Sequence, residues 1–374
     1  MREHLNAALF DLKRSAIREF SKLANAKAGC IKLTLGEPDF RTPAPISAQV
    51  TASLSAGETH YIDNNGTLEL RQAIAAHEQK HGLNYAPDEI ILTAGATEAL
   101  FVALFGILEP NDEVIIPQPA FVLYEEQVKM CRGKVVPLDT SADGFQIRAE
   151  RLEPLISART KAIVLNSPNN PTGAVYDTES LDAVYHAVRD RNIFIICDDV
   201  YRDLVYDGAF HSFAERRELK EKILYIQSFS KPYAMTGWRM GWLIADSSIK
   251  ERLELVHQFT VVSTPAPFQR ACITALEQDI GAFRDEYRAR RDYCVKRLTA
   301  MGLSFPRPDG AFYLFPKVGG DSAAFCRTLI DEAGVALTPG ICFGMEGYAR
   351  LSYACSMHDL QNGLDRLEKF LKTR

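Results

Sequence analysis

The sequence predicts an α/β protein with a mostly parallel seven-stranded sheet, helices on both faces of that sheet, and a smaller α+β domain. The first observation is a series of short apolar runs rich in β-branched residues, interspersed with longer amphipathic stretches. The second is a change of pattern after about residue 302, where apolar runs become fewer and helices surround them. The third is the length, because 374 residues leave room for two domains.

The expected elements follow in order along the chain. Strands are expected at 89–93, 113–117, 134–138, 161–166, 193–198, 223–228 and 240–245. Helices are expected at 96–108 and 179–191, with one long helical stretch at 267–300. Beyond it, strand-like runs at 310–315 and 348–354 alternate with helices near 322–333 and 358–372.

The two chain ends are expected to form one unit. The first 45 residues have no place in the parallel sheet, and the proline-rich stretch 38–45 resembles a connector. We therefore expect a large domain of residues 46–275 and a small domain built from residues 1–45 and 276–374.

Composition excludes several classes of function. The 43 basic and 48 acidic residues give a net charge of -5, which is unsuited to nucleic-acid binding. We find neither a run of about 18 apolar residues nor the apolar core of a signal peptide, so we expect no membrane partner. The eight scattered cysteines form no C-x-x-C pair, as is typical of reduced thiols in a cytoplasmic protein.

One motif suggests a metal. His77, Glu78 and His81 match H-E-x-x-H, which in a metalloprotease places two imidazoles one helical turn apart on zinc. Here the match falls in the last turn of an expected helix, against Gly82 and on the face opposite its apolar residues. No third ligand is evident downstream. We therefore expect a solvated helix end and no metal site.

Two common nucleotide motifs are absent. No G-x-G-x-x-G follows any expected strand, and no G-x-x-x-x-G-K-[ST] occurs. An α/β fold alone does not name a function, so the function must come from a specific site.

The segment 228–241, SFSKPYAMTGWRMG, directly follows an expected strand. Lys231 would therefore lie at a strand end, where ligand sites of α/β proteins form. A single lysine is usually a surface charge, but this one lies between serines and eight residues before Arg239. The whole segment resembles the cofactor-lysine motif of class I pyridoxal-phosphate aminotransferases, which have the fold called type I.

Further motifs of that family occur in family order between residues 36 and 350. They are LGEPDF around Gly36, Tyr61, the turn Gly95-Ala96-Thr97 that opens a helix, Phe121, the turn 166–173 with Asn170, CDDVY with Asp198 and Tyr201, and Arg350 in YARLSYA. Singly, each is explained by a turn glycine, a core aromatic, a helix cap or a surface charge. Together, in this order, they favour the resemblance.

The resemblance implies a role for each residue. Lys231 would be the catalytic residue, because it binds the cofactor covalently and moves a proton. Asp198 would face the pyridine nitrogen and Arg350 the substrate α-carboxylate, with Gly36 and Asn170 also on the substrate side. The other cofactor contacts implied are Tyr61, Gly95, Ala96, Thr97, Phe121, Asn170, Tyr201, Ser228, Ser230 and Arg239.

The resemblance also implies the reaction and the assembly. It predicts a ping-pong transfer of the amino group from an L-amino acid to an oxo acid such as 2-oxoglutarate. In the family, the tyrosine that Tyr61 resembles reaches the cofactor phosphate of the neighbouring subunit. We therefore expect a homodimer with shared active sites.

The substrate stays open at this level. Segments 15–20, 33–40, 308–316 and 349–370 resemble subgroup Iγ, and within it the N-acetyl-diaminopimelate branch. Aromatic and aspartate aminotransferases share the same pattern, and the sequence does not place the pocket residues that select the side chain.

Two other functions are open to the same fold. One is a carbon–sulfur β-lyase of the cystathionine type, which uses the same lysine and arginine. The other is a ligand-sensing domain of a transcription regulator. The sensor needs an N-terminal helix-turn-helix module, for which the roughly 35 residues before LGEPDF are too few.

Overall fold

The computed structural model describes residues 4–13 and 16–373. Predictions that include residues 1–3, 14, 15 or 374 extend outside the described residues. They are the small-domain prediction, at residues 1–3, 14, 15 and 374, and segment 15–20, at Ser15. The large sheet has seven strands in the order β2-β8-β7-β6-β5-β3-β4, and only β8 runs opposite to the other six. The strands are β2 (Ile90–Thr93), β3 (Glu113–Gln118), β4 (Lys134–Asp139), β5 (Thr160–Asn166), β6 (Phe194–Asp198), β7 (Ile223–Ser228) and β8 (Gly241–Ala245).

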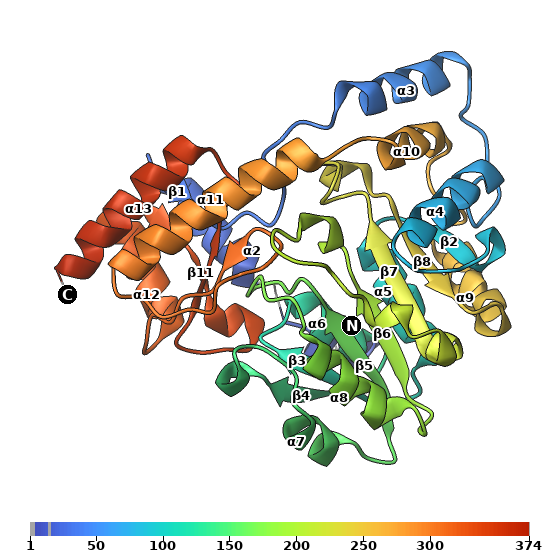
Figure 1. The fold of residues 1–374 in the computed structure, drawn as a ribbon, viewed down its shortest axis with the longest axis horizontal. Coiled ribbons are helices and arrows are strands. Elements are labelled where there is room, and N and C mark those ends of the chain that lie inside the picture. Colours follow the sequence, from blue (N-terminus) through green and yellow to red (C-terminus); the bar gives the residue numbers. More distant parts are fainter. Residues whose placement is uncertain (1–3, 14–15, 374) are drawn as a thin grey trace.

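Helices cover both faces of this sheet, as predicted (Figure 1). Alternate strand residues point to opposite faces, so Ile163 and Leu165 join one core while Ala162 and Val164 join another. The first core includes side chains of α4 (Leu68–Lys80), α8 (Thr178–Val188) and α10 (Gln269–Leu276). The second includes α5 (Ala96–Ile107), α6 (Val122–Met130) and α9 (Ser247–Thr260). Helices α3 (Ala44–Ser55) and α7 (Ala149–Leu152) complete this part of the chain.

The segments Ala16–Ala26 and Ile31–Lys32 pack with the C-terminal part of the chain, on the left in Figure 1. Strand β1 (Ile31–Lys32) pairs in parallel with β10 (Val335–Ala336), and Phe20 shares a core with Leu351. A second sheet has the order β11-β12-β9. The remaining elements are α1 (Ala8–Asp11), α2 (Ala16–Ala26), α11 (Gly281–Ala300), β9 (Tyr313–Leu314), α12 (Ser322–Thr328), a π-helix (Leu329–Ala333), β11 (Thr338–Pro339), β12 (Ala349–Ser352) and α13 (Met357–Lys372).

The single long helical stretch expected at 267–300 is wrong in one respect. The chain forms α10 and α11 with a break between them, where Asp279 Oδ1 accepts a hydrogen bond of 2.8 Å from Gly281 N. A carboxylate that pairs with a free N–H starts a new helix here, although the apolar pattern continues.

The expected solvated end of α4 is also wrong. Glu78 is 0% exposed and accepts a 2.6 Å hydrogen bond from Arg202 Nη1, which also donates to Tyr225 Oη. The short 3₁₀ helix Arg202–Leu204 after β6 packs on this turn and supplies the countercharge that a buried carboxylate requires. Burial lowers the pKa of the half-buried imidazoles His77 and His81. Among the described residues, no helix is both long and apolar enough to cross a membrane.

Candidate active site

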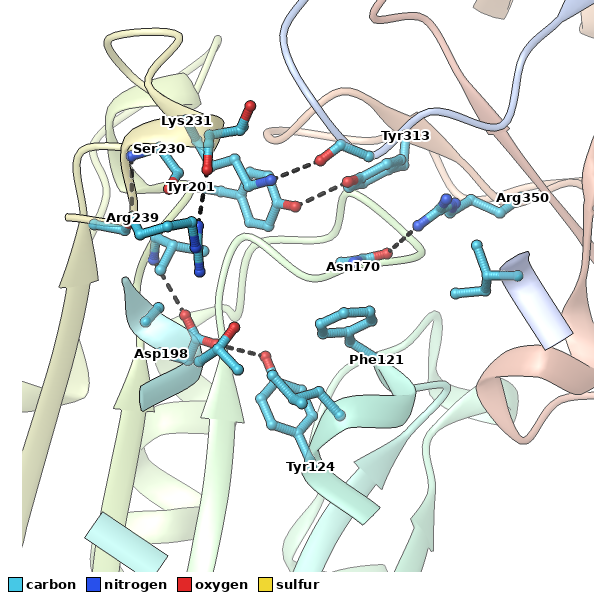
Figure 2. A pocket seen from close by; sticks show the side chains of 18 residues that line it. Phe121, Tyr124, Asn170, Asp198, Tyr201, Ser230, Lys231, Arg239, Tyr313 and Arg350 are labelled. Atoms are coloured by element: carbon cyan, nitrogen blue, oxygen red, sulfur yellow. Dashed lines mark hydrogen bonds between the residues drawn. The ribbon is translucent and has the colours of Figure 1, made fainter. Parts of the chain in front are cut away.

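The carboxyl ends of the central strands meet at one edge of the sheet. Strands β5, β6 and β7 are parallel and end at Asn166, Asp198 and Ser228. Strand β2 runs in the same direction, because both β2 and β7 pair antiparallel with β8. A cavity of about 260 Å³ lies at this edge, where open α/β sheets bind ligands (Figure 2).

Most of the predicted site residues line this cavity. They are Gly36, Ala96, Thr97, Phe121, Asn170, Asp198, Tyr201, Ser228, Ser230, Lys231, Arg239 and Arg350. Gly95 lies behind the wall, directly before α5. Tyr61 is the exception, since it is 88% exposed and does not line the cavity.

Lys231 lies just beyond the end of β7 and points into the cavity (Figure 2). Its Nζ donates a 2.6 Å hydrogen bond to the carbonyl of Gly36. Burial lowers the pKa of Lys231 to about 8; Arg350 and Arg239 lower it further, while Glu37 opposes the shift. A substantial fraction of this amine is therefore neutral near pH 8, the form that attacks a carbonyl carbon.

Asp198 ends β6 and is 8% exposed. Its Oδ2 accepts a 2.7 Å hydrogen bond from Tyr124 Oη. Burial raises the pKa of Asp198 to about 6, although the Tyr124 hydrogen bond opposes the shift. A buried carboxylate of this kind favours a cationic partner, such as a protonated ring nitrogen.

Tyr124 is a site residue that was not predicted from the sequence. It lies three residues after Phe121, one turn into α6, and both side chains line the cavity. That helical spacing was the available signal, because residues three apart share a helix face.

An anion cradle forms where α5 begins. The first N–H groups of a helix have no partner within the helix, and Ala96 and Thr97 present them at the cavity. Gly95 has φ +77°, and a Cβ there would lie 2.5 Å from Arg239 Nη2, so the turn requires glycine. Ser228 and Ser230 line the cavity too. A guanidinium, a helix N-terminus and two serines together suit a phosphate group.

Arg350 forms the opposite wall. It is 2% exposed, and its Nη1 and Nη2 donate to Asn170 Oδ1 (2.9 Å) and Thr34 O (2.7 Å). Its Nε is buried without a hydrogen-bond partner. Among the described residues, no carboxylate forms an ion pair with Arg350. A substrate carboxylate would supply the missing countercharge.

Tyr313 of β9 is a second residue that the sequence analysis missed. Its hydroxyl lies 2.8 Å from the hydroxyl of Tyr201, and the Arg350 guanidinium lies 4.5 Å from the centre of its ring. It falls within the expected strand 310–315, but only the fold shows that this strand reaches the cavity.

Comparison with known proteins identifies the family to which this chain belongs. Residues 28–367 match the family of class I and II aminotransferases, and the chain belongs to that family. The chain is 40% identical to a protein of Bacillus subtilis (strain 168) named "Probable N-acetyl-LL-diaminopimelate aminotransferase", over 99% of this chain and 96% of the relative. It is 37% identical to "Aromatic-amino-acid aminotransferase 2" of Thermococcus litoralis, over 96% of each chain.

A solved structure agrees as well. The crystal structure of aspartate aminotransferase from Thermotoga maritima has a TM-score of 0.95 to this chain at 38% identity, covering 98% of this chain and 100% of that one. The predicted fold class and the predicted aminotransferase function are therefore confirmed, and these relatives give no support to the β-lyase.

Proposed function

We propose that this aminotransferase works with pyridoxal 5′-phosphate held in the cavity at the sheet edge. The observation that carries the proposal is the convergence of a half-buried lysine, a buried aspartate and an anion cradle on one cavity. Lys231 would hold the aldehyde end, Asp198 the ring nitrogen and the start of α5 with Arg239 the phosphate. Phe121 and Tyr201 would contact the ring.

The cofactor, when bound, supplies an electron sink for charge that develops at the substrate Cα. The chain supplies the rest. Lys231 Nζ takes up a proton and returns it inside the cavity, because a pKa of about 8 allows both the neutral and the protonated amine to exist. Asp198 favours the protonated ring nitrogen. Arg350 would bind the α-carboxylate of the substrate through its guanidinium, whose Nε has no partner in the chain.

We propose an L-amino acid as donor and an oxo acid such as 2-oxoglutarate as acceptor, used in a ping-pong order. The relatives named above support N-acetyl-L,L-diaminopimelate or an aromatic amino acid as the donor. Ile17 and Leu123 add apolar surface to the cavity wall. A screen of donors with 2-oxoglutarate tests the choice, and inactivity with both classes would contradict it. Release of pyruvate from cystathionine without an acceptor would indicate the β-lyase instead.

We propose a homodimer in which Tyr61 reaches the neighbouring active site. Tyr61 and Phe259 are 88% and 83% exposed, unusual values for large apolar side chains. The two regions adjoin, because His257 Nε2 of α9 donates a 2.7 Å hydrogen bond to Asn64 O. Leu54, Leu68 and Val262 are exposed as well. Equilibrium sedimentation tests this proposal, and a fully active monomer would contradict it.

We propose two domains, residues 46–275 and residues 1–45 with 276–374. The pairing of β1 with β10 and the core shared by Phe20 and Leu351 support this division.

We also propose a cytoplasmic location. All eight cysteines are free and seven are buried, which suits a reducing compartment.

Lys231→Ala tests the proposed chemistry. We expect turnover to fall by about 10²- to 10⁴-fold and the visible absorbance of lysine-bound cofactor to be lost. Lys296→Ala, an exposed lysine on α11, is the control and should keep both. Full activity of Lys231→Ala would refute the assignment.

A further inference from the structure

The last turn of α4 carries a cluster that the aminotransferase reaction does not use. His77 and His81 are one helical turn apart, and their ring centres are 5.0 Å from each other. No third ligand is evident in the sequence, but the fold brings Asp203 to the pair. One ligand atom from each of His77, His81 and Asp203 can be chosen so that all three lie within 4.8 Å of one another.

We propose that His77, His81 and Asp203 form a binding site for a divalent transition-metal ion of the zinc type. Two imidazoles and one carboxylate are a ligand set that zinc takes, with a water in the fourth position. Bonds of about 2.0–2.2 Å place tetrahedral ligands about 3.3 Å apart, so the three atoms need to close by at most about 1.5 Å. All three side chains are half-buried, which leaves them room to rotate.

The surroundings favour a cation despite the arginine nearby. Arg202 Nη2 lies 3.3 Å from His77 Nε2, so a metal on this nitrogen replaces one long hydrogen bond. The guanidinium keeps its contacts with Glu78 and Tyr225. Asp203 Oδ1 lies 3.7 Å from Arg202 Nε, so two carboxylates, Glu78 and Asp203, face one guanidinium. Because both carboxylate oxygens of Glu78 are paired with Arg202, Glu78 is not free to act as the base of a zinc protease.

An open position exists beside the ligands. His81 and Asp203 line a separate cavity next to α4, which gives an ion and its water an entry path. Asp203 lies two residues after Tyr201, which lines the active site. A bound ion would join the end of α4 to the 3₁₀ turn that follows Tyr201.

Zinc binding to the metal-stripped holoenzyme tests the site. We measure Zn²⁺ stoichiometry and affinity by titration calorimetry, and thermal unfolding with and without Zn²⁺. We expect one ion per chain at this site and a rise in melting temperature on addition of Zn²⁺. Removing an outer-shell partner of a metal costs about 10- to 100-fold in affinity, so H77Q/H81Q should weaken binding at least that much. Asp203→Asn should weaken it as well.

The control removes two histidines elsewhere. H186Q/H358Q changes two exposed imidazoles and should bind Zn²⁺ like the parent. His81→Gln alone serves if the double variant does not fold. Unchanged affinity in H77Q/H81Q or in His81→Gln, or absence of binding to the parent protein, would overturn the proposal. Activity is not the readout, so failure here is distinct from failure of the proposed function.

Discussion

The two walls of the active-site cavity are built differently. The floor, with Asp198, Ser228 and the start of α5, lies at the carboxyl ends of β6, β7 and β2, whose residues are nearly all buried. The opposite wall, with Gly36, Tyr313 and Arg350, comes from short strands and loops near the chain ends. Lys231 joins them, because it follows β7 and bonds to the carbonyl of Gly36.

We infer that the floor and the opposite wall have different tasks. A floor fixed by a seven-stranded sheet suits a group that stays in place through every turnover. A wall on a separate small sheet suits a substrate that enters and leaves. We therefore expect floor variants to lower kcat for every substrate and wall variants to raise KM for the carboxylate substrate.

Asp198→Asn gives the largest effect expected from this comparison. Asparagine keeps the shape but removes the negative charge, so a protonated ring nitrogen loses its partner. We expect kcat to fall by about 10²- to 10³-fold with all donors. Steady-state kinetics with two donors is the measurement, and a loss confined to one donor would contradict the assignment of Asp198 to the floor.

Arg350→Lys should have the next largest effect. Lysine keeps the charge but loses the planar fork, and with it one charge-assisted hydrogen bond worth about 1.5–3 kcal/mol. We expect kcat/KM to fall by about 10- to 100-fold, chiefly through KM, while cofactor absorbance is kept. A fall in kcat with unchanged KM would contradict the assignment of Arg350 to the wall that binds the substrate.

The pKa of Lys231 tests whether the wall influences a residue that follows the floor strands. Burial is the main cause of the value of about 8, but Arg350 on the far wall also lowers it. In the cofactor-free protein the attacking form is the neutral amine. The rate of cofactor attachment should therefore fall about tenfold per pH unit below about pH 8 and level off above it.

Stopped-flow absorbance over a pH series measures this midpoint. Arg350→Gln removes one positive charge, so its midpoint should move to higher pH. A midpoint near the ordinary lysine pKa of about 10.4 in the parent protein would contradict the burial of this amine. An unmoved midpoint in Arg350→Gln would show that the two walls act separately.

The floor could be predicted from the sequence far better than the wall. Asp198 and Lys231 follow apolar runs whose strand character is evident, and parallel strand ends meet at one edge by geometry alone. Tyr313 could not be placed, because its role depends on how a two-residue strand packs beside Tyr201, which follows β6 of the large sheet. Glu78 was misjudged for a different reason. It follows Leu70 and Ile74 at intervals of four and lies on their buried face, although it was assigned to the opposite face. Its partner Arg202 is brought to it only by the fold.

Tyr124→Phe and Tyr313→Phe form a matched pair of hydroxyl deletions, and Tyr313→Phe has the smallest expected effect. Each removes one hydroxyl, Tyr124 from Asp198 on the floor and Tyr313 from Tyr201 on the wall. The bond of Tyr124 to a carboxylate is worth about 1.5–3 kcal/mol, so Tyr124→Phe should lower kcat by about 10- to 100-fold. The bond between two neutral hydroxyls is worth about 0.5–1.5 kcal/mol, so Tyr313→Phe should lower kcat/KM by about 2- to 10-fold. Tyr124→Phe should also raise the pKa of Asp198, since that hydrogen bond holds it down. Its kcat should therefore decline at a higher pH on the acid side than that of Tyr313→Phe. Identical acid limbs in the two pH profiles would show that the hydroxyl of Tyr124 does not tune the floor.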